Sequence, residues 1–104
     1  MTSHGTAHAR FTRALTNRNV LGAETAAREL GWLSLEDALG LCVLLADRDP
    51  ARFERAALRW LKRLLAERRP SLEEVALAVA ALDGLRDGSR AASVFTLKRL
   101  ARPG

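Results

Sequence analysis

Hydrophobic residues recur at every third or fourth position along most of this chain, the spacing that gathers them on one face of an α-helix. Phe11, Ala14 and Leu15 are an example, and no stretch shows the strict alternation of apolar and polar residues expected of a half-buried strand. Residues typical of turns and helix caps divide the pattern into six segments. We therefore expect an all-α protein whose helices lie at about residues 6–16, 20–30, 34–46, 50–68, 71–82 and 89–101.

Cap residues predict where several of these helices begin and end. Ser34 and Ser71 are expected N-caps, because a serine oxygen can accept a hydrogen bond from a backbone N–H of the first turn, and Ser71 also begins the capping-box sequence SLEE. Gly31 is typical of a left-handed C-terminal cap. Asp49 and Pro50 are expected to start the fourth helix, with the aspartate as its cap and the proline at its first position.

Two parts of the sequence repeat at nearly constant spacing. The stretch SLEDA at 34–38 returns as SLEEV at 71–75, and AALRWLKRL at 56–64 is echoed by ASVFTLKRL at 92–100. A repeated unit of this length with helical spacing is typical of stacked helical hairpins. We expect three stacked hairpins, with a compact six-helix bundle as the alternative.

The third and fifth helices are apolar on every side over residues 38–46 and 75–82. A helix of this kind must be enclosed by neighbours. We expect these two helices to form an inner row that shelters Leu41, Leu44 and Val79. The fourth and sixth helices should then form an outer row with one face in water.

The pairing of helices and the unit length are similar to tetratricopeptide-type and related α-solenoid repeats over about residues 9–101. That resemblance implies a fold that holds partners. The phrases ARFTRAL, AARELGWLSLEDAL and RFERAALRWLKRLLAE also resemble a group of short, uncharacterised helical proteins from high-GC filamentous bacteria. Because no activity is assigned to that group, the resemblance implies no functional residues.

The 104 residues suit a single helical domain at 6–101, preceded by a flexible N-terminus at 1–5 and followed by a tail at 102–104. The longest apolar runs are well short of the ~20 residues that a membrane-spanning helix needs. The N-terminal residues also lack the apolar core of a secretory signal. We therefore expect a cytoplasmic protein without a membrane partner.

The net charge of +5 is concentrated in the fourth helix, where residues 50–69 hold seven basic and two acidic residues. At about 100° per residue the basic side chains fall on one arc of this helix. The arc is either a solvated face or a contact surface for nucleic-acid phosphates or an acidic protein patch. Its members are Arg52, Arg55, Arg59, Lys62 and Arg63, with Arg69 at the edge.

A second candidate interface lies on the sixth helix, where Phe95, Lys98, Arg99 and Arg102 share a face. An exposed aromatic ring with a basic rim is a common interface anchor. The alternative is that Phe95 packs on a neighbouring helix or beneath the arginine stems.

Residues suited to chemistry are few. His4 and His8 are four positions apart, but a metal site needs three or four converging ligands. Cys42 stands alone in an apolar run and is expected to be a buried structural thiol. Trp32 and Trp60 are expected in the core, with Trp32 closing the end of the first hairpin. We therefore expect no enzyme, no cofactor and no metal.

These observations favour a non-enzymatic helical-repeat interaction or scaffold module that binds a protein partner or its own copy as a homodimer. The alternative is a nucleic-acid-binding protein that contacts phosphates through the basic face of the fourth helix.

Overall fold

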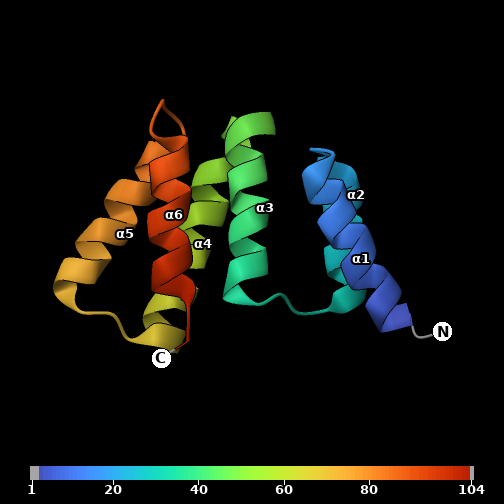
Figure 1. Cartoon of the computed structure of the whole chain (residues 1–104), viewed down its shortest axis with the longest axis horizontal. Coiled ribbons are helices and arrows are strands. Elements are labelled where there is room, and N and C mark those ends of the chain that lie inside the picture. The colour runs from blue at the N-terminus through green and yellow to red at the C-terminus, as the bar shows by residue number, and fades with distance from the viewer. Residues whose placement is uncertain (1–2, 104) are drawn as a thin grey trace.

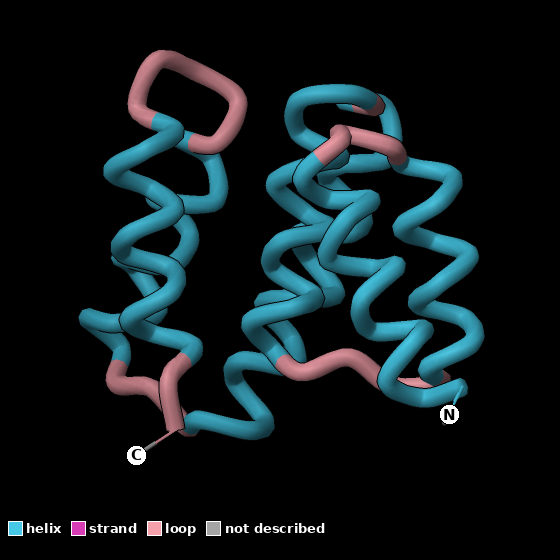
Figure 2. Tube along the Cα trace, turned by 45° about the vertical axis from the view of Figure 1, so that its right-hand side comes forward, coloured by secondary structure: helices cyan, strands magenta, loops and turns pink. Residues whose placement is uncertain are grey.

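The computed structural model describes residues 3–103, with side chains from residue 6 onward, and every regular element in that part is an α-helix. The prediction of an all-α protein with six helices is confirmed. The helices form three successive hairpins, α1/α2, α3/α4 and α5/α6, with connecting loops at both ends of the molecule (Figures 1 and 2). Their bounds are α1 Ser3–Thr16, α2 Val20–Leu30, α3 Leu35–Arg48, α4 Pro50–Arg68, α5 Leu72–Gly84 and α6 Arg90–Ala101.

Three of the predicted caps are confirmed. Ser34 Oγ accepts a hydrogen bond from the backbone N–H of Asp37 at 3.0 Å. Ser71 Oγ accepts one from the N–H of Glu74 at 3.1 Å, and the Glu74 carboxylate accepts one from the N–H of Ser71 at 2.9 Å, which completes the capping box. Gly31 ends α2 at a φ of 78°, a left-handed conformation that favours glycine.

Two predicted helix starts differ from the structure. Asp49 makes no side-chain cap bond to α4, and its carboxylate accepts a hydrogen bond from Arg52 Nε at 2.7 Å. The first helix starts at Ser3, so the described part of the segment predicted to be flexible, residues 3–5, is already helical. Residues 1, 2 and 104 lie outside the described part of the chain.

The main core is shared by the second and third hairpins. Trp60 of α4 is 2% exposed, and its indole N–H donates a hydrogen bond of 2.8 Å to the carbonyl oxygen of Leu35. Around it are the apolar side chains of α3, α4, α5 and α6. The fully buried members of this cluster with the largest side chains are Trp60, Leu35, Leu39, Leu64, Leu85 and Leu97.

The third hairpin is turned the other way from the prediction. Helix α3 packs against α6 and not against α5, while α4 contacts both α5 and α6. The expected inner row of α3 and α5 is therefore wrong. Helix α5 buries only its alanine-rich side, so Val79 remains 50% exposed, whereas α6 inserts Leu97 and Ala101 into the core. Leu44 is buried and Leu41 partly buried, as expected.

Helix α3 is the only described helix whose backbone packs closely on α1 and α2. Helix α4 reaches the first hairpin through a side chain, in the ion pair of Arg52 with Glu24. Leu44 of α3 is the buried link, because it joins Phe11, Ala14 and the alanines of α2 in a second apolar cluster. Gly40 permits the close approach, since a Cβ there would lie 2.9 Å from Cδ1 of Leu15. In Figure 1, α2 lies behind α1, and α4 behind α3 and α6.

Ion pairs add to this contact. Their partners come from both hairpins, so they bridge the boundary between them. They are Arg18 with Asp47 at 2.7 Å and Glu24 with Arg52 at 2.9 Å, and beside them His8 Nε2 lies 3.1 Å from a carboxylate oxygen of Asp37.

None of the helices described is both long and apolar enough to cross a membrane.

We expect Leu44→Ala to lower the free energy of unfolding by about 2–4 kcal/mol, because it removes buried methyl groups from the link between the first hairpin and α3. Amide hydrogen exchange in α1 and α2 should accelerate more than exchange in α4. Urea denaturation followed by circular dichroism gives the first quantity and exchange mass spectrometry the second. The matched control is Leu72→Ala, at a side chain that is 87% exposed, which should change stability by less than about 0.5 kcal/mol. Equal losses in the two variants would contradict the role given to Leu44.

Candidate functional site

A groove of about 710 Å³ runs between α2 and α4, on the side of α3 that neither helix covers. Its floor comes from one face of α3, where Ala38, Leu41, Cys42 and Leu45 follow the i, i+3, i+4, i+7 spacing. This floor exists because α3 is apolar all round, so the face that its neighbours leave open is also apolar.

The walls of the groove are rich in arginine. Arg28 comes from α2 and four further arginines from α4, against a single lining carboxylate, that of Glu24. Positions 52, 55, 59 and 63 share a face of α4 because they are three or four residues apart. Eleven steps of 1.5 Å spread them over about 17 Å of helix. The arginines of the groove are Arg28, Arg52, Arg55, Arg59 and Arg63.

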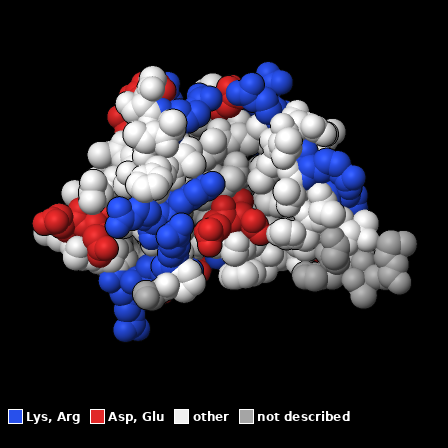
Figure 3. Space-filling view, in the orientation of Figure 1, with Lys and Arg blue, Asp and Glu red and all other residues white. Residues whose placement is uncertain are grey.

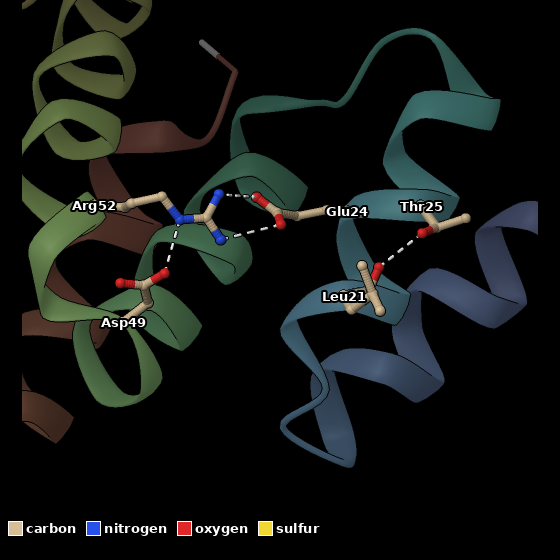
Figure 4. Close-up of polar contacts among 5 residues, drawn as sticks. All are labelled: Leu21, Glu24, Thr25, Asp49 and Arg52. Carbon is tan, nitrogen blue, oxygen red and sulfur yellow. Dashed lines mark hydrogen bonds and ion pairs between the residues drawn. The ribbon is translucent and has the colours of Figure 1, made fainter.

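Two of these arginines are held by carboxylates. Arg52 donates to both oxygens of Glu24, at 2.9 and 3.1 Å, and to Asp49 at 2.7 Å (Figure 4). Hydrogen bonds with Glu24 and then with Asp49 raise the pKa of Arg52 above its ordinary value. Arg63 Nε donates to Glu67 at 2.8 Å. The ion pair between Glu24 of α2 and Arg52 of α4 connects the two walls of the groove at the end where α4 starts.

The other three arginines of the groove have no carboxylate partner within residues 3–103. They are Arg28, Arg55 and Arg59. All three are exposed. An uncompensated row of cations beside an apolar floor attracts an anionic group that can also bring apolar surface.

At its other end the groove continues into a hollow of about 640 Å³ that reaches Trp32. The expectation that Trp32 lies in the core is wrong, because its side chain is 68% exposed, whereas Trp60 is buried as expected. Trp32 lies in the turn that follows Gly31. Its indole ring lies against the Arg63 guanidinium, with Cζ of Arg63 5.2 Å from the ring centroid. Nη2 of Arg63 is buried and has no hydrogen-bond acceptor among the described residues.

Cys42 in the floor is a buried thiol, as predicted. Its Sγ donates a weak hydrogen bond to the carbonyl oxygen of Ala56 at 3.6 Å. Burial raises the pKa of this thiol to about 12, and the nearby charge of Arg59 offsets only part of that effect. The thiol is therefore protonated at neutral pH and is a poor nucleophile.

Four residues of the predicted basic arc line the groove, namely Arg52, Arg55, Arg59 and Arg63, but the groove itself was not predicted from the sequence. Lys62 is exposed beside the groove without lining it, and Arg69 lies past the end of α4 at a φ of 48°. Arg28 could not be found from sequence patterns, because its role depends on α2 and α4 facing each other across α3.

The second predicted surface is not gathered into one hollow. Phe95 is 64% exposed and lies under the Arg99 guanidinium, with Cζ 5.9 Å from the ring centroid. Lys98 borders a hollow between α1 and α6, whereas Arg99 and Arg102 border another beside Pro70. Figure 3 shows Lys and Arg side chains together over the lower half of α6, with acidic side chains on either side.

The described histidine side chain lies away from the groove. His8 Nε2 is 3.1 Å from a carboxylate oxygen of Asp37, and the side chain of His4 is outside the described part. Among the residues that the structure describes, no three His, Cys, Asp or Glu side chains gather as metal ligands would.

No family model, curated protein or solved structure matches the chain.

The raised pKa of Cys42 predicts a loss of stability in alkali. The ordinary pKa of 9.0 applies to the unfolded chain, so the unfolded chain loses the thiol proton first as the pH rises. The contribution of the neutral thiol is therefore complete below about pH 9 and decreases between about pH 9 and 12. By pH 10 we expect the wild type to lose about 1 kcal/mol more unfolding free energy than Cys42→Ala. Urea denaturation of both proteins at pH 7, 9 and 10 measures the difference, and parallel losses would contradict the prediction.

Proposed function

We propose that this protein is a non-enzymatic helical interaction module that holds a protein partner in the groove between α2 and α4. One observation carries the proposal: a single concave surface joins an apolar floor on α3 to a wall of arginines. Partner surfaces commonly combine a buried apolar centre with a polar rim, and arginine is enriched in such interfaces. The proposal places this binding in the cytoplasm.

The chemistry of the groove supports binding rather than catalysis. The thiol of Cys42 is buried and protonated, and His8 is engaged by Asp37 on another side of the molecule. Guanidinium groups stay charged at all ordinary pH values and donate hydrogen bonds, so they hold anions and do not act as bases.

Nucleic-acid binding is the second candidate, favoured by the cations of α4 that have no carboxylate partner in the described structure. Arg55, Arg59 and Lys62 are exposed on this helix and could neutralise phosphates. The two candidate functions predict different effects of changing Lys62, because this residue is exposed on α4 but does not line the groove.

A pull-down from cell extract distinguishes them. We expect the wild type to retain a protein partner after nuclease treatment, and Arg55→Glu with Arg59→Glu to lose most of it, because two cations of the groove wall become anions. The matched control is Arg13→Glu with Arg48→Glu, which changes the net charge equally at exposed positions outside the groove. This control should retain the partner.

Three results would speak against the leading proposal. Capture that disappears with nuclease and is weakened as much by Lys62→Glu as by the groove variant favours nucleic acid. If the variants at Arg55 with Arg59 and at Arg13 with Arg48 lose the partner equally, the groove is not the binding surface. Light scattering that gives twice the monomer mass, unchanged in the groove variant, indicates self-association through another surface.

A further inference from the structure

We propose that the occupant of this groove is an acidic amphipathic α-helix of a partner protein, with carboxylates against the arginine wall and an apolar stripe against α3. This inference rests on the proposed function and adds the chemical class and conformation of the partner.

The shape of the groove favours an elongated occupant. Its lining follows α4 from Ala51 to Arg63, which at 1.5 Å per residue is about 18 Å. The same length corresponds to about twelve residues, or three turns, of a helix lying alongside α4.

The spacing of the charges favours a helical occupant as well. Arg55 and Arg59 are one helical turn apart on this wall and have no carboxylate partner among the described residues, whereas Arg63 on the next turn already donates to Glu67. Carboxylates at i and i+4 of a second helix repeat at the same interval. Arg28 faces this wall from α2, so acidic residues on both flanks of the occupant find cations.

Small side chains at the bottom of the groove allow another helix to come close. They are Ala27 of α2, Ala38 of α3 and Ala56 of α4, so the backbone of an inserted helix can approach closely. Leu41, which is only partly buried, offers an apolar contact between them. An apolar stripe flanked by carboxylates therefore complements this floor and its walls, as in other helix-in-groove interactions.

Other occupants fit the groove less well. Adding a β-strand needs an exposed sheet edge, and residues 3–103 form only helices and loops. Bases of a single-stranded nucleic acid stack on exposed aromatic rings, but the aromatic side chain that lines the groove, Trp60, is only 2% exposed. The exposed ring at the groove end, Trp32, already has the Arg63 guanidinium 5.2 Å from its centroid.

The test uses the full chain and a fluorescein-labelled peptide of about eighteen residues built from Leu, Ala and Glu. Leu occupies one helical stripe of the peptide and Glu both flanks. The controls are a scrambled peptide of equal composition and a peptide in which every Glu is Lys. We expect fluorescence anisotropy at low salt to show at least about tenfold tighter binding of the amphipathic acidic peptide than of either control. Binding should shift the emission of the exposed Trp32 to shorter wavelength.

Variants of the groove supply the second part of the test. Arg55→Glu with Arg59→Glu should weaken the acidic peptide at least about tenfold and strengthen binding of the Lys peptide, because the charge pairing is reversed. Ala27→Leu keeps the charge, fills the floor and should weaken the acidic peptide several-fold. Arg13→Glu with Arg48→Glu should stay within about twofold of the wild type. Circular dichroism checks that every variant keeps its helicity.

Equal affinity for the acidic and scrambled peptides, or no effect of either groove variant, would overturn the inference. So would tighter binding of a single-stranded oligonucleotide that Lys62→Glu weakens as much as the groove variant does. A cellular partner that depends on Arg55 and Arg59 while the acidic peptide fails to bind would reject this occupant and leave the proposed function standing. Failure of the proposed function is recognised separately, by cell-extract capture that is indifferent to the groove variants.

Discussion

Helix α3 has apolar side chains around its whole circumference, and burying them requires neighbours on every side. Four helices supply that cover, since α3 packs against α1, α2, α4 and α6. It is also the only described helix whose backbone packs closely on the first hairpin. The three hairpins are too few to close the remaining gap between α2 and α4. The face of α3 left there becomes the floor of the groove, so the same constraint that holds the fold together creates its candidate binding surface.

The electrostatics of the groove follow from where acidic residues are placed. Glu24 and Asp49 hold Arg52, and Glu67 holds Arg63, so the two ends of the arginine row are oriented by carboxylates. The described structure offers no such partner to the middle of the row. Like charges on neighbouring helical turns repel each other by a few tenths of a kcal/mol per pair. A ligand that brings carboxylates relieves this repulsion, which adds to the direct attraction.

The first hairpin is attached differently from the other two. The second and third hairpins share a continuous apolar core around Trp60, whereas α1 and α2 have a separate cluster linked through Leu44. Ion pairs across the boundary orient the first hairpin more than they stabilise the fold, because each partly exposed pair contributes little to the free energy of unfolding. Asp47 lies between Arg18 of the first hairpin and Arg90 of the third, so it relates the positions of all three. Since α2 forms one wall, the groove depends on the Leu44 cluster and the ion pairs that together hold the first hairpin against α3.

The six helices and their pairing could be predicted from the sequence, because helical periodicity, the Ser34 and Ser71 caps and the Gly31 terminus act between residues that are close along the chain. The basic arc of α4 could also be predicted, because it depends only on helical geometry. That α6 rather than α5 covers α3 could not be predicted in this way, because both helices carry apolar residues and the choice depends on how their side chains pack in three dimensions. The exposure of Trp32 and the position of Arg28 opposite the basic arc of α4 could not be predicted for the same reason. These features depend on distances between α2 and α4, which are far apart along the chain and meet only across the surface of α3.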